Sequence, residues 1–104
     1  MKMVWIYITN PSKAVANKVA FHLIKERLGV CVNIFPIESV YRWKGKITKE
    51  REWVALVKTL QSKSMLIEKE ISRIHPYTIP CIAAIDVGIN KKYSKWAESE
   101  IKPK

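Results

Sequence analysis

The sequence predicts an α+β domain in which two helices cover one face of a four-stranded antiparallel sheet and a third helix follows. Two observations predict it. Strand-type apolar runs and helix-type apolar rows alternate along the 104 residues, and residues 30–60 form two long strand patterns around a tight turn. The resulting order, β-α-β-β-α-β, is the ferredoxin-like pattern. Residues 1–104 are predicted to form one domain, long enough for a modest core.

Residues 3–9 are the first predicted strand, and a helix follows the Asn10-Pro11 pair. Asn10 is the predicted helix cap and Pro11 the first helical residue, where no N–H group is needed. The helix has apolar residues in two adjacent rows, at positions 15, 19 and 23 and at 16, 20, 24 and 28. These rows make one broad buried face. Gly29 is predicted to end the helix in a left-handed conformation.

The long hairpin of residues 30–60 contains one proline and one glycine that shape it. Pro36 cannot donate a hydrogen bond to a sheet, so a bend that interrupts the strand is predicted between Phe35 and Ser39. The chain reverses at residues 44–46, where Gly45 supplies the positive φ of a tight turn.

The length of the return strand, residues 47–60, predicts an oligomer. About 14 residues at roughly 3.3 Å each span ~45 Å, whereas a domain of about 100 residues is roughly 34 Å across. The predicted tip carries Tyr41, Trp43 and Trp53, which one small domain cannot cover. Another copy of the chain is the expected cover, and the helix-free face of the sheet also needs a partner.

The second half of the chain completes the pattern. Ser62 or Ser64 is predicted to cap a second helix that ends at His75-Pro76, because the residue before proline disfavours helical backbone. The predicted buried face of this helix consists of Ile67, Ile71 and Ile74. Residues 79–87 are predicted to be a short buried strand. Gly88 and Asn90 lead into the terminal helix, whose apolar face is Tyr93, Trp96, Ala97 and Ile101.

Composition excludes several classes of protein. The 48% hydrophobic content excludes general disorder, and no apolar stretch approaches the ~20 residues of a membrane span. The N-terminus is typical of a first strand and not of a signal peptide, which predicts a cytoplasmic protein. The net charge of +10 would attract polyanions, but the charges are dispersed, so nucleic acid is not the expected partner.

Cys31 and Cys81 each lie in an apolar strand pattern and do not form a CxxC motif. The default interpretation is two buried free thiols that act as small hydrophobic groups. A disulfide is not expected in a cytoplasmic protein.

Several short motifs stand in one order and spacing along nearly the whole chain. They are Cys31-Val32-Asn33-Ile34, the SVYRWKGK block at 39–46, Glu52, Lys58-Thr59, His75-Pro76-Tyr77, Pro80, Tyr93 and Trp96. In these the chain resembles the CutA family. The resemblance implies a homotrimer of ferredoxin-like subunits and a role in divalent-cation tolerance, with copper or another divalent metal as ligand. No cofactor is expected to be required for folding.

The candidate metal ligands are Cys31 and His75. A thiolate suits Cu(I) and an imidazole suits copper or zinc, but Cys31 is also a candidate for simple packing. His75 is equally placed to cap helix carbonyls. The residues predicted to line a cleft between subunits are Tyr41, Trp43, Glu52, Lys58 and Tyr77.

Two of these predictions leave alternatives open. Lys58 is either a functional cation in the cleft or an ion-pair partner for Glu52 or another acid. Arg42 and Trp43 at the hairpin tip are expected to stack on each other or on a neighbouring subunit.

The chain departs from the CutA pattern at Thr78 and Cys81, where the family commonly has acidic residues. Two hard oxygen ligands are lost and one soft sulfur is gained, which predicts weak metal binding or a shift towards soft ions.

Two functions are therefore expected in order of preference. The first is a trimeric, metal-responsive protein with weak or accessory ion binding. The second is a regulator like the PII signalling proteins, which the CutA family resembles in fold and trimeric build, with a small anion or nucleotide in clefts between subunits. No nucleophile–base–orienter set can be assembled from the sequence, so an enzyme is not predicted.

Overall fold

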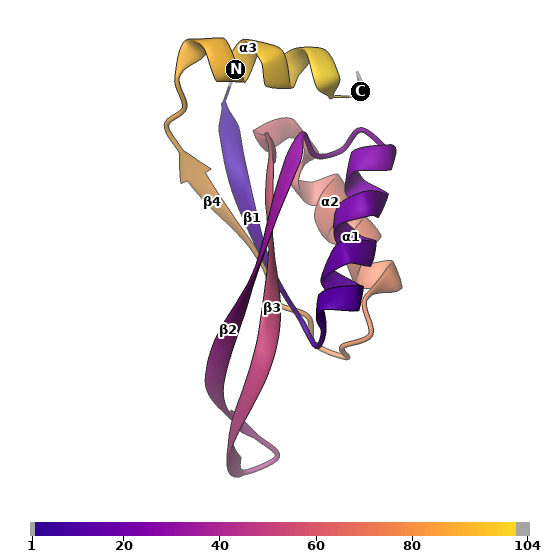
Figure 1. Ribbon diagram of the computed structural model, residues 1–104, viewed down its shortest axis with the longest axis vertical. Coiled ribbons are helices and arrows are strands. Elements are labelled where there is room, and N and C mark those ends of the chain that lie inside the picture. The colour runs from indigo at the N-terminus through magenta and orange to yellow at the C-terminus, as the bar shows by residue number, and fades with distance from the viewer. Residues whose placement is uncertain (1, 102–104) are drawn as a thin grey trace.

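The computed structural model describes residues 2–101. Its elements are β1 (Met3–Asn10), α1 (Lys13–Lys25), β2 (Cys31–Trp43), β3 (Lys46–Leu60), the short 3-10 helix η1 (Gln61–Lys63), α2 (Ser64–Ile74), β4 (Ile82–Val87) and α3 (Lys91–Glu100). The four strands form one sheet in the order β2-β3-β1-β4, with every neighbouring pair antiparallel. Helices α1 and α2 lie on one face, and α3 lies across the end of the sheet (Figure 1). The predicted ferredoxin-like order is confirmed.

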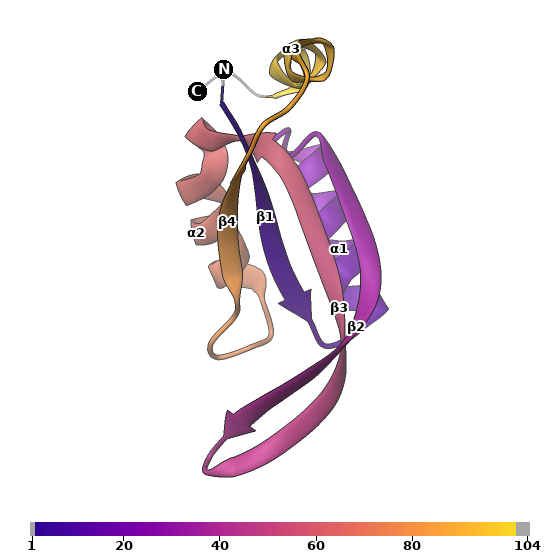
Figure 2. The same cartoon turned by 90° about the vertical axis from the view of Figure 1, so that its left-hand side faces the viewer.

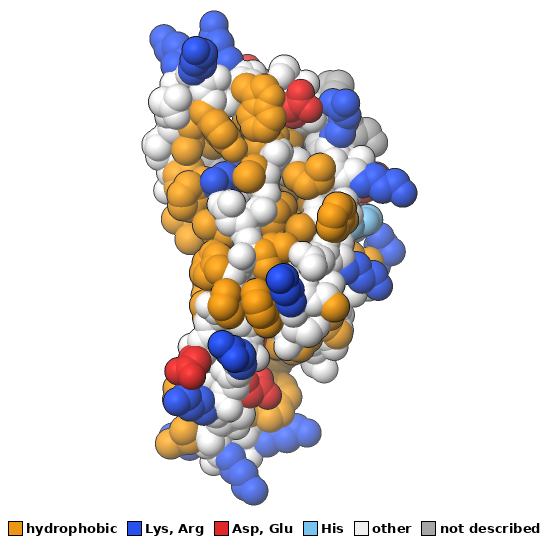
Figure 3. All heavy atoms as spheres, viewed as in Figure 1, with side chains coloured by type: hydrophobic (Ala, Val, Ile, Leu, Met, Phe, Trp, Pro, Cys, Tyr) orange, Lys and Arg blue, Asp and Glu red, His pale blue; other side chains and the backbone are white. Residues whose placement is uncertain are grey.

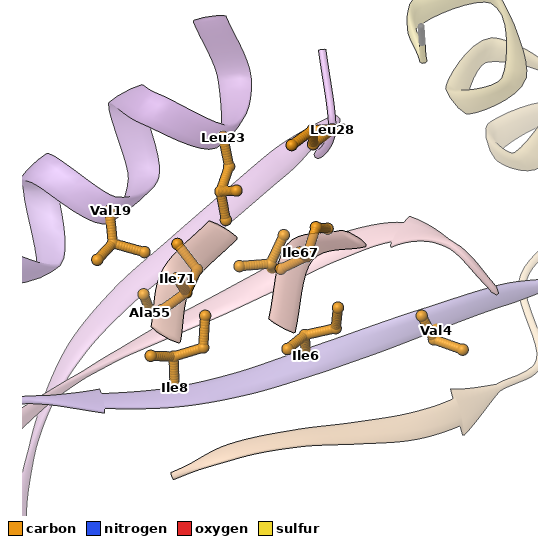
Figure 4. Close-up of a cluster of buried hydrophobic side chains, with 10 residues drawn as sticks. Val4, Ile6, Ile8, Val19, Leu23, Leu28, Ala55, Ile67 and Ile71 are labelled. Carbon is orange, nitrogen blue, oxygen red and sulfur yellow. The ribbon is translucent and has the colours of Figure 1, made fainter. Parts of the chain in front are cut away.

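The main core lies between the sheet and helices α1 and α2. Figure 4 shows side chains of β1 and β3 directed towards those of the two helices. The cluster consists of Val4, Ile6, Ile8, Val19, Leu23, Leu28, Ala55, Val57, Ile67 and Ile71. The predicted apolar rows of both helices are thus confirmed, except that Ile24 remains 41% exposed. A second cluster of Met3, Leu60, Ala97 and Ile101 holds α3 against the end of the sheet.

The predicted helix caps are wrong at both major helices. The N-cap of α1 is Ser12, whose hydroxyl accepts a hydrogen bond from the Val15 N–H at 3.2 Å. Asn10 is instead fully buried in β1, and its amide donates to the carbonyls of Ile8 and Trp53. Neither predicted serine caps α2, because η1 leads directly into the helix and Lys63 stands at its N-cap without a side-chain hydrogen bond.

The prediction that Gly29 ends α1 in a left-handed conformation is wrong. Arg27 adopts that conformation instead, with φ of 57°. The glycine is needed for close packing instead. A Cβ atom at residue 29 would lie 2.9 Å from Cγ1 of Val57, too near for an ordinary contact. The missing side chain lets the segment after α1 lie directly against β3.

The hairpin is a continuous ladder from the Cys31–Lys58 pair to the Trp43–Lys46 pair. The interruption predicted around Pro36 is absent from this ladder. β2 is an edge strand, and β3 is its one neighbour in the sheet. The outer side of β2 makes no ladder hydrogen bonds, so a proline without an N–H group is tolerated there and the strand continues. The predicted turn is confirmed, since Lys44 and Gly45 have φ of 50° and 79°, the pattern of a two-residue hairpin turn.

The hairpin extends beyond the rest of the sheet, as its length predicts. Pairing between β1 and β3 ends at Asn10 and Trp53, so residues 37–43 and 46–52 form a two-stranded ribbon, called the arm below. Figure 2 shows the arm projecting past β1 and curving under the loop before β4. The molecule measures 45 × 25 × 20 Å. Trp53 lies at the base of the arm and not at its tip, beneath the Lys13 ammonium group at 5.6 Å.

The sheet face opposite α1 and α2 is open. Side chains alternate along β1, so Trp5 and Tyr7 point away from the core. Residues paired with them across the sheet share this open face, which therefore carries Trp5, Tyr7, Phe35, Leu56 and Ile85. Figure 3 shows hydrophobic side chains along the middle of the molecule, whereas lysines and arginines gather mainly at its ends and along the helix side. The predicted strand at 79–87 is shorter, Ile82–Val87, and mostly exposed instead of buried, because it is an edge strand with no cover on its outer face.

The two cysteines are free thiols. Cys31 is partly buried, but Cys81 is exposed, contrary to the prediction, because it precedes β4 in a loop. Trp96 on α3 is also 46% exposed, so the predicted apolar face of that helix is only partly covered. In the described residues no helix is both long and apolar enough to cross a membrane.

Candidate cleft at the base of the arm

A cavity of about 590 Å³ lies between the arm and the loop that joins α2 to β4. Figure 2 shows these two segments facing each other. The arm contributes Ser39, Tyr41, Trp43, Thr48, Glu50 and Glu52. The loop contributes Pro76, Tyr77, Thr78, Ile79 and Cys81, and Thr9 closes the side at the end of β1. This cavity is called the cleft below.

Strand alternation explains why the arm residues of the cleft share one face. Side chains point to alternate sides of a strand, and residues directly paired across two antiparallel strands point to the same side. The ladder pairs Ser39 with Glu50 and Tyr41 with Thr48. The opposite face of the arm carries the pairs Glu38–Arg51, Val40–Lys49 and Arg42–Ile47, which strand alternation directs away from the cleft.

Two tyrosine–glutamate pairs are the main polar feature of the cleft. The Tyr41 hydroxyl donates to Oε1 of Glu50 at 2.6 Å, and the Tyr77 hydroxyl donates to Oε2 of Glu52 at 2.6 Å. The hydrogen bond to Glu50 is the main cause that raises the pKa of Tyr41 to about 12. Burial, followed by the hydrogen bond to Glu52, raises the pKa of Tyr77 well above its ordinary value. Both phenols therefore remain protonated donors at neutral pH.

His75 holds the loop side of the cleft in place. Its Nδ1 accepts a hydrogen bond from the Tyr77 N–H at 3.1 Å, so the ring proton is on Nε2. Nε2 lies 3.0 Å from both the Thr9 carbonyl and Oδ1 of Asn10. Burial is the main cause that lowers the pKa of His75, which keeps the ring neutral at neutral pH. The ring thus joins the end of α2 to the end of β1 and does not cap helix carbonyls.

Cys31 and His75, the predicted metal pair, are not brought together within one chain. Cys31 pairs with Lys58, which pairs in turn with Trp5, whereas His75 contacts Thr9 at the other end of β1. Four residues of strand separate these places by roughly 13 Å. No group of three or more His, Cys, Asp or Glu side chains in the described part of the chain is arranged to hold a metal ion.

Lys58 is likewise remote from the cleft of its own chain. It is six positions from Glu52 on the same strand, or roughly 20 Å, and its ammonium group lies 5.4 Å from the centre of the Trp5 ring. Within residues 2–101, Arg42 does not stack on Trp43, and the alternative of stacking on a neighbouring subunit stays a prediction. The cation over the Trp43 ring is Lys44, at 6.0 Å, and Arg42 donates to the Gly45 carbonyl.

Four of the five predicted cleft residues do line one cavity in the structure: Tyr41, Trp43, Glu52 and Tyr77. Sequence reasoning missed Glu50, Ser39 and Thr48. The signal for them was present, because a two-residue turn at Gly45 sets the register of the whole hairpin, and counting back by twos from Glu52 reaches Glu50 and Thr48. Thr78 and Cys81, where the chain departs from the CutA pattern, also line the cleft.

The fold and the cleft define a class of protein: a small ferredoxin-like domain with a projecting hairpin arm and an acidic, aromatic cleft between that arm and the loop before β4. Comparison with known proteins identifies the family within this class. The family model described as CutA1 divalent ion tolerance protein matches residues 4–100. The chain belongs to the CutA family of divalent-cation tolerance proteins.

Individual relatives agree with this assignment. The divalent-cation tolerance protein CutA of Archaeoglobus fulgidus is 39% identical over 99 residues, which cover 93% of this chain and 96% of the relative. Among solved structures, CutA1 from Oryza sativa has a TM-score of 0.95 at 32% identity and covers 100% of this chain and 97% of its own. The A. fulgidus structure, described as a periplasmic divalent cation tolerance protein, has a TM-score of 0.93 at 38% identity, with 96% and 99% covered. These comparisons do not favour a regulator like the PII proteins.

Proposed function

We propose that this chain acts as a homotrimeric, non-enzymatic divalent-cation tolerance protein of the cytoplasm that binds copper or other divalent cations weakly in the cleft. One observation carries the proposal. In a chain of the CutA family with a net charge of +10, strand β3 of the arm places two carboxylates, Glu50 and Glu52, in the cavity that the arm forms with the loop.

The homotrimer is supported by surfaces that one chain leaves uncovered. The arm is a two-stranded ribbon with Trp43 46% exposed and Ile47 74% exposed. Both outer strands of the sheet, β2 and β4, have one free edge. Free edges and a continuous apolar face favour association with another chain, and CutA membership makes three subunits the proposed number.

The cleft residues suit a weakly held metal. Carboxylate oxygens of Glu50 and Glu52 are donors for hard divalent ions, and the Cys81 sulfur is a donor for soft ones. Each carboxylate already accepts a tyrosine hydrogen bond, so a metal would have to compete with it. The threonine at position 78 supplies no carboxylate. The donor set therefore fits accessory binding better than a tight resident metal.

The metal pair of Cys31 and His75 stays a prediction. It would require a second subunit to bring the two side chains together, and His75 would have to release one of its hydrogen bonds. Lys58 would also reach a cleft only from a neighbouring subunit. The core is closed by apolar contacts, which supports folding without a metal.

Isothermal titration calorimetry with copper, zinc and magnesium salts tests the proposal. We expect weak binding of copper and zinc that Glu52→Gln reduces at least fivefold. Glu38→Gln is the matched control, because Glu38 lies on the same arm but on the face directed away from the cleft. Absence of binding for every cation, or equal loss in the two variants, contradicts the proposed metal role.

A further inference from the structure

We infer that a hydrogen-bond network at the base of the arm fixes the direction of the arm, so that three copies close into a ring instead of adding to one another as an open chain. The network, called the base network below, consists of Asn10, Glu52, Trp53, His75 and Tyr77. The inference rests on the homotrimer of the proposed function and names the residues that select this assembly over others.

The arm needs support at its base because it is long and thin. Residues 37–43 and 46–52 form a two-stranded ribbon beyond the last pair between β1 and β3, and a two-stranded hairpin alone is marginally stable in water. Seven residues of strand extend roughly 23 Å. A rotation of about 10° at the base would therefore move the tip by roughly 4 Å, as much as the whole distance between two side chains in contact.

Consecutive residues of β3 hold the base of the arm on both of its faces. Strand alternation directs Glu52 and Trp53 to opposite faces. On the cleft side, Oε2 of Glu52 accepts a hydrogen bond from the Tyr77 hydroxyl at 2.6 Å. On the helix side, the Lys13 ammonium group lies 5.6 Å from the centre of the Trp53 ring. Rotation of the arm towards either side would break the contact on the other, so the two contacts together define one direction.

Tyr77 can hold the arm because its own position is fixed by the end of β1. The Tyr77 N–H donates to Nδ1 of His75 at 3.1 Å, and Nε2 of His75 lies 3.0 Å from Oδ1 of Asn10. The Asn10 amide donates in turn to the Trp53 carbonyl at 3.0 Å. The hydrogen bonds thus run from the arm through the loop and the end of β1 back to the base of the arm.

The burial of these polar side chains supports a positioning role. Asn10, Glu52 and His75 are all buried, and burial of polar groups is costly unless they are hydrogen-bonded. A network whose members are hydrogen-bonded to one another favours a single arrangement of the chain. Within the described residues the Glu52 carboxylate uses only Oε2 in this network. Its other oxygen can accept a cation from a neighbouring subunit without loss of the bond to Tyr77.

The direction of the arm decides which assembly forms. A head-to-tail contact between identical chains closes into a ring of three only if successive copies are rotated by about 120°, and otherwise it continues as an open chain. Because the arm is the projecting element (Figure 2), its angle to the rest of the subunit sets this rotation when it lies on a neighbouring copy. An arm that is free to rotate at its base would allow several assemblies beside the trimer.

The variant Tyr77→Phe tests the inference because it removes one hydroxyl group and keeps the ring against His75, where the ring centres are 4.9 Å apart. Tyr41→Phe is the matched control. Tyr41 also donates to a carboxylate at 2.6 Å, but that carboxylate belongs to Glu50 on the same arm. By light scattering coupled to size-exclusion chromatography at micromolar concentration, we expect a trimer alone in the wild type and in Tyr41→Phe. In Tyr77→Phe we expect smaller and larger species beside the trimer.

Hydrogen exchange of the arm amides, followed by mass spectrometry, is a second measurement on the same proteins. Exchange over residues 46–52 should be at least about fivefold faster in Tyr77→Phe than in the wild type, and should change less than about twofold in Tyr41→Phe. Lys13→Gln, at an exposed position, is a second variant for the case that Tyr77→Phe fails to fold. It removes the contact on the other face and should give the same mixture of species to a smaller extent.

The outcomes separate this inference from the proposed homotrimer. If the wild type is not a trimer, both fail. If the wild type is a trimer and Tyr77→Phe keeps its mass and its exchange rates, only the inference is overturned. Equal effects of Tyr77→Phe and Tyr41→Phe also overturn it, as does an unchanged mass in Lys13→Gln when Tyr77→Phe does not fold.

Discussion

Replacement of His75 by Ala should destabilise the protein because this side chain joins three segments. The change leaves three polar groups without their partner: the Thr9 carbonyl, Oδ1 of Asn10 and the Tyr77 N–H. Loss of a partner for a buried polar group costs about 1–3 kcal/mol, and water can reach some of the vacated space. We therefore expect a loss of about 2–4 kcal/mol in the free energy of unfolding, or roughly 8–16 °C in Tm.

The pH dependence gives a second signature of the same residue. Burial lowers the pKa of His75 in the folded state, so between that value and about 6.5 the unfolded chain binds the proton more readily. Stability should be complete above about pH 6.5 and should fall as the pH is lowered through this window. In His75→Ala this part of the slope should disappear.

Thermal melts of wild type and His75→Ala at pH 7.5 and 5.5, followed by circular dichroism, measure both effects. His22→Ala is the control, since His22 makes a single partly exposed contact, with Glu70 of α2, whereas His75 contacts three buried or partly buried polar groups. An unchanged Tm in His75→Ala together with lost copper binding would refute the structural role and favour His75 as a metal ligand.

Two further predictions concern packing and the cleft loop. Gly29→Ala should lower the free energy of unfolding by about 1–3 kcal/mol in denaturant titrations, because its Cβ would meet Val57. The control, Gly88→Ala, has open space around its Cβ and should change the free energy of unfolding by less than about 0.5 kcal/mol. Equal effects of the two substitutions would argue against the close approach of Gly29 to Val57. Thr78→Glu combined with Cys81→Glu should raise the affinity for magnesium or manganese about tenfold, roughly 1.4 kcal/mol, by calorimetry; no change in this double variant would mean that the loop takes no part in metal binding.

The order of elements could be predicted from the sequence because apolar periodicity follows directly from burial. The rows of α1 and α2 and the alternation of β1 are imposed by the same core that Figure 4 shows. The turn at Gly45 could also be predicted from the sequence, since a two-residue hairpin turn requires positive φ at that position.

The sequence signals for the ends of helices were less informative, because tertiary contacts use the same residues for other purposes. Asn10 is a good helix cap in isolation, but its amide is taken up by sheet carbonyls. Gly29 has a packing role that only the position of Val57 reveals. The residue types were noticed correctly, and their partners were not visible in the sequence.

The cleft was predicted in part for a related reason. The family resemblance predicts that Tyr41, Trp43, Glu52 and Tyr77 line a cleft between subunits; in the single chain they line one cavity, and their place between subunits stays a prediction. Lys58 lies six positions from Glu52 on one strand, roughly 20 Å away, and the strand pairing places it beside Cys31, so its place in a cleft between subunits stays a prediction.

We propose that one chain is incomplete and that three copies cover its arm and open sheet face. Light scattering coupled to size-exclusion chromatography at micromolar concentration tests this most directly. We expect a mass about three times the 12.1 kDa of the chain, and partial dissociation in Trp43→Ala, where an exposed aromatic group on the arm is lost. A folded species of 12.1 kDa at that concentration would contradict it.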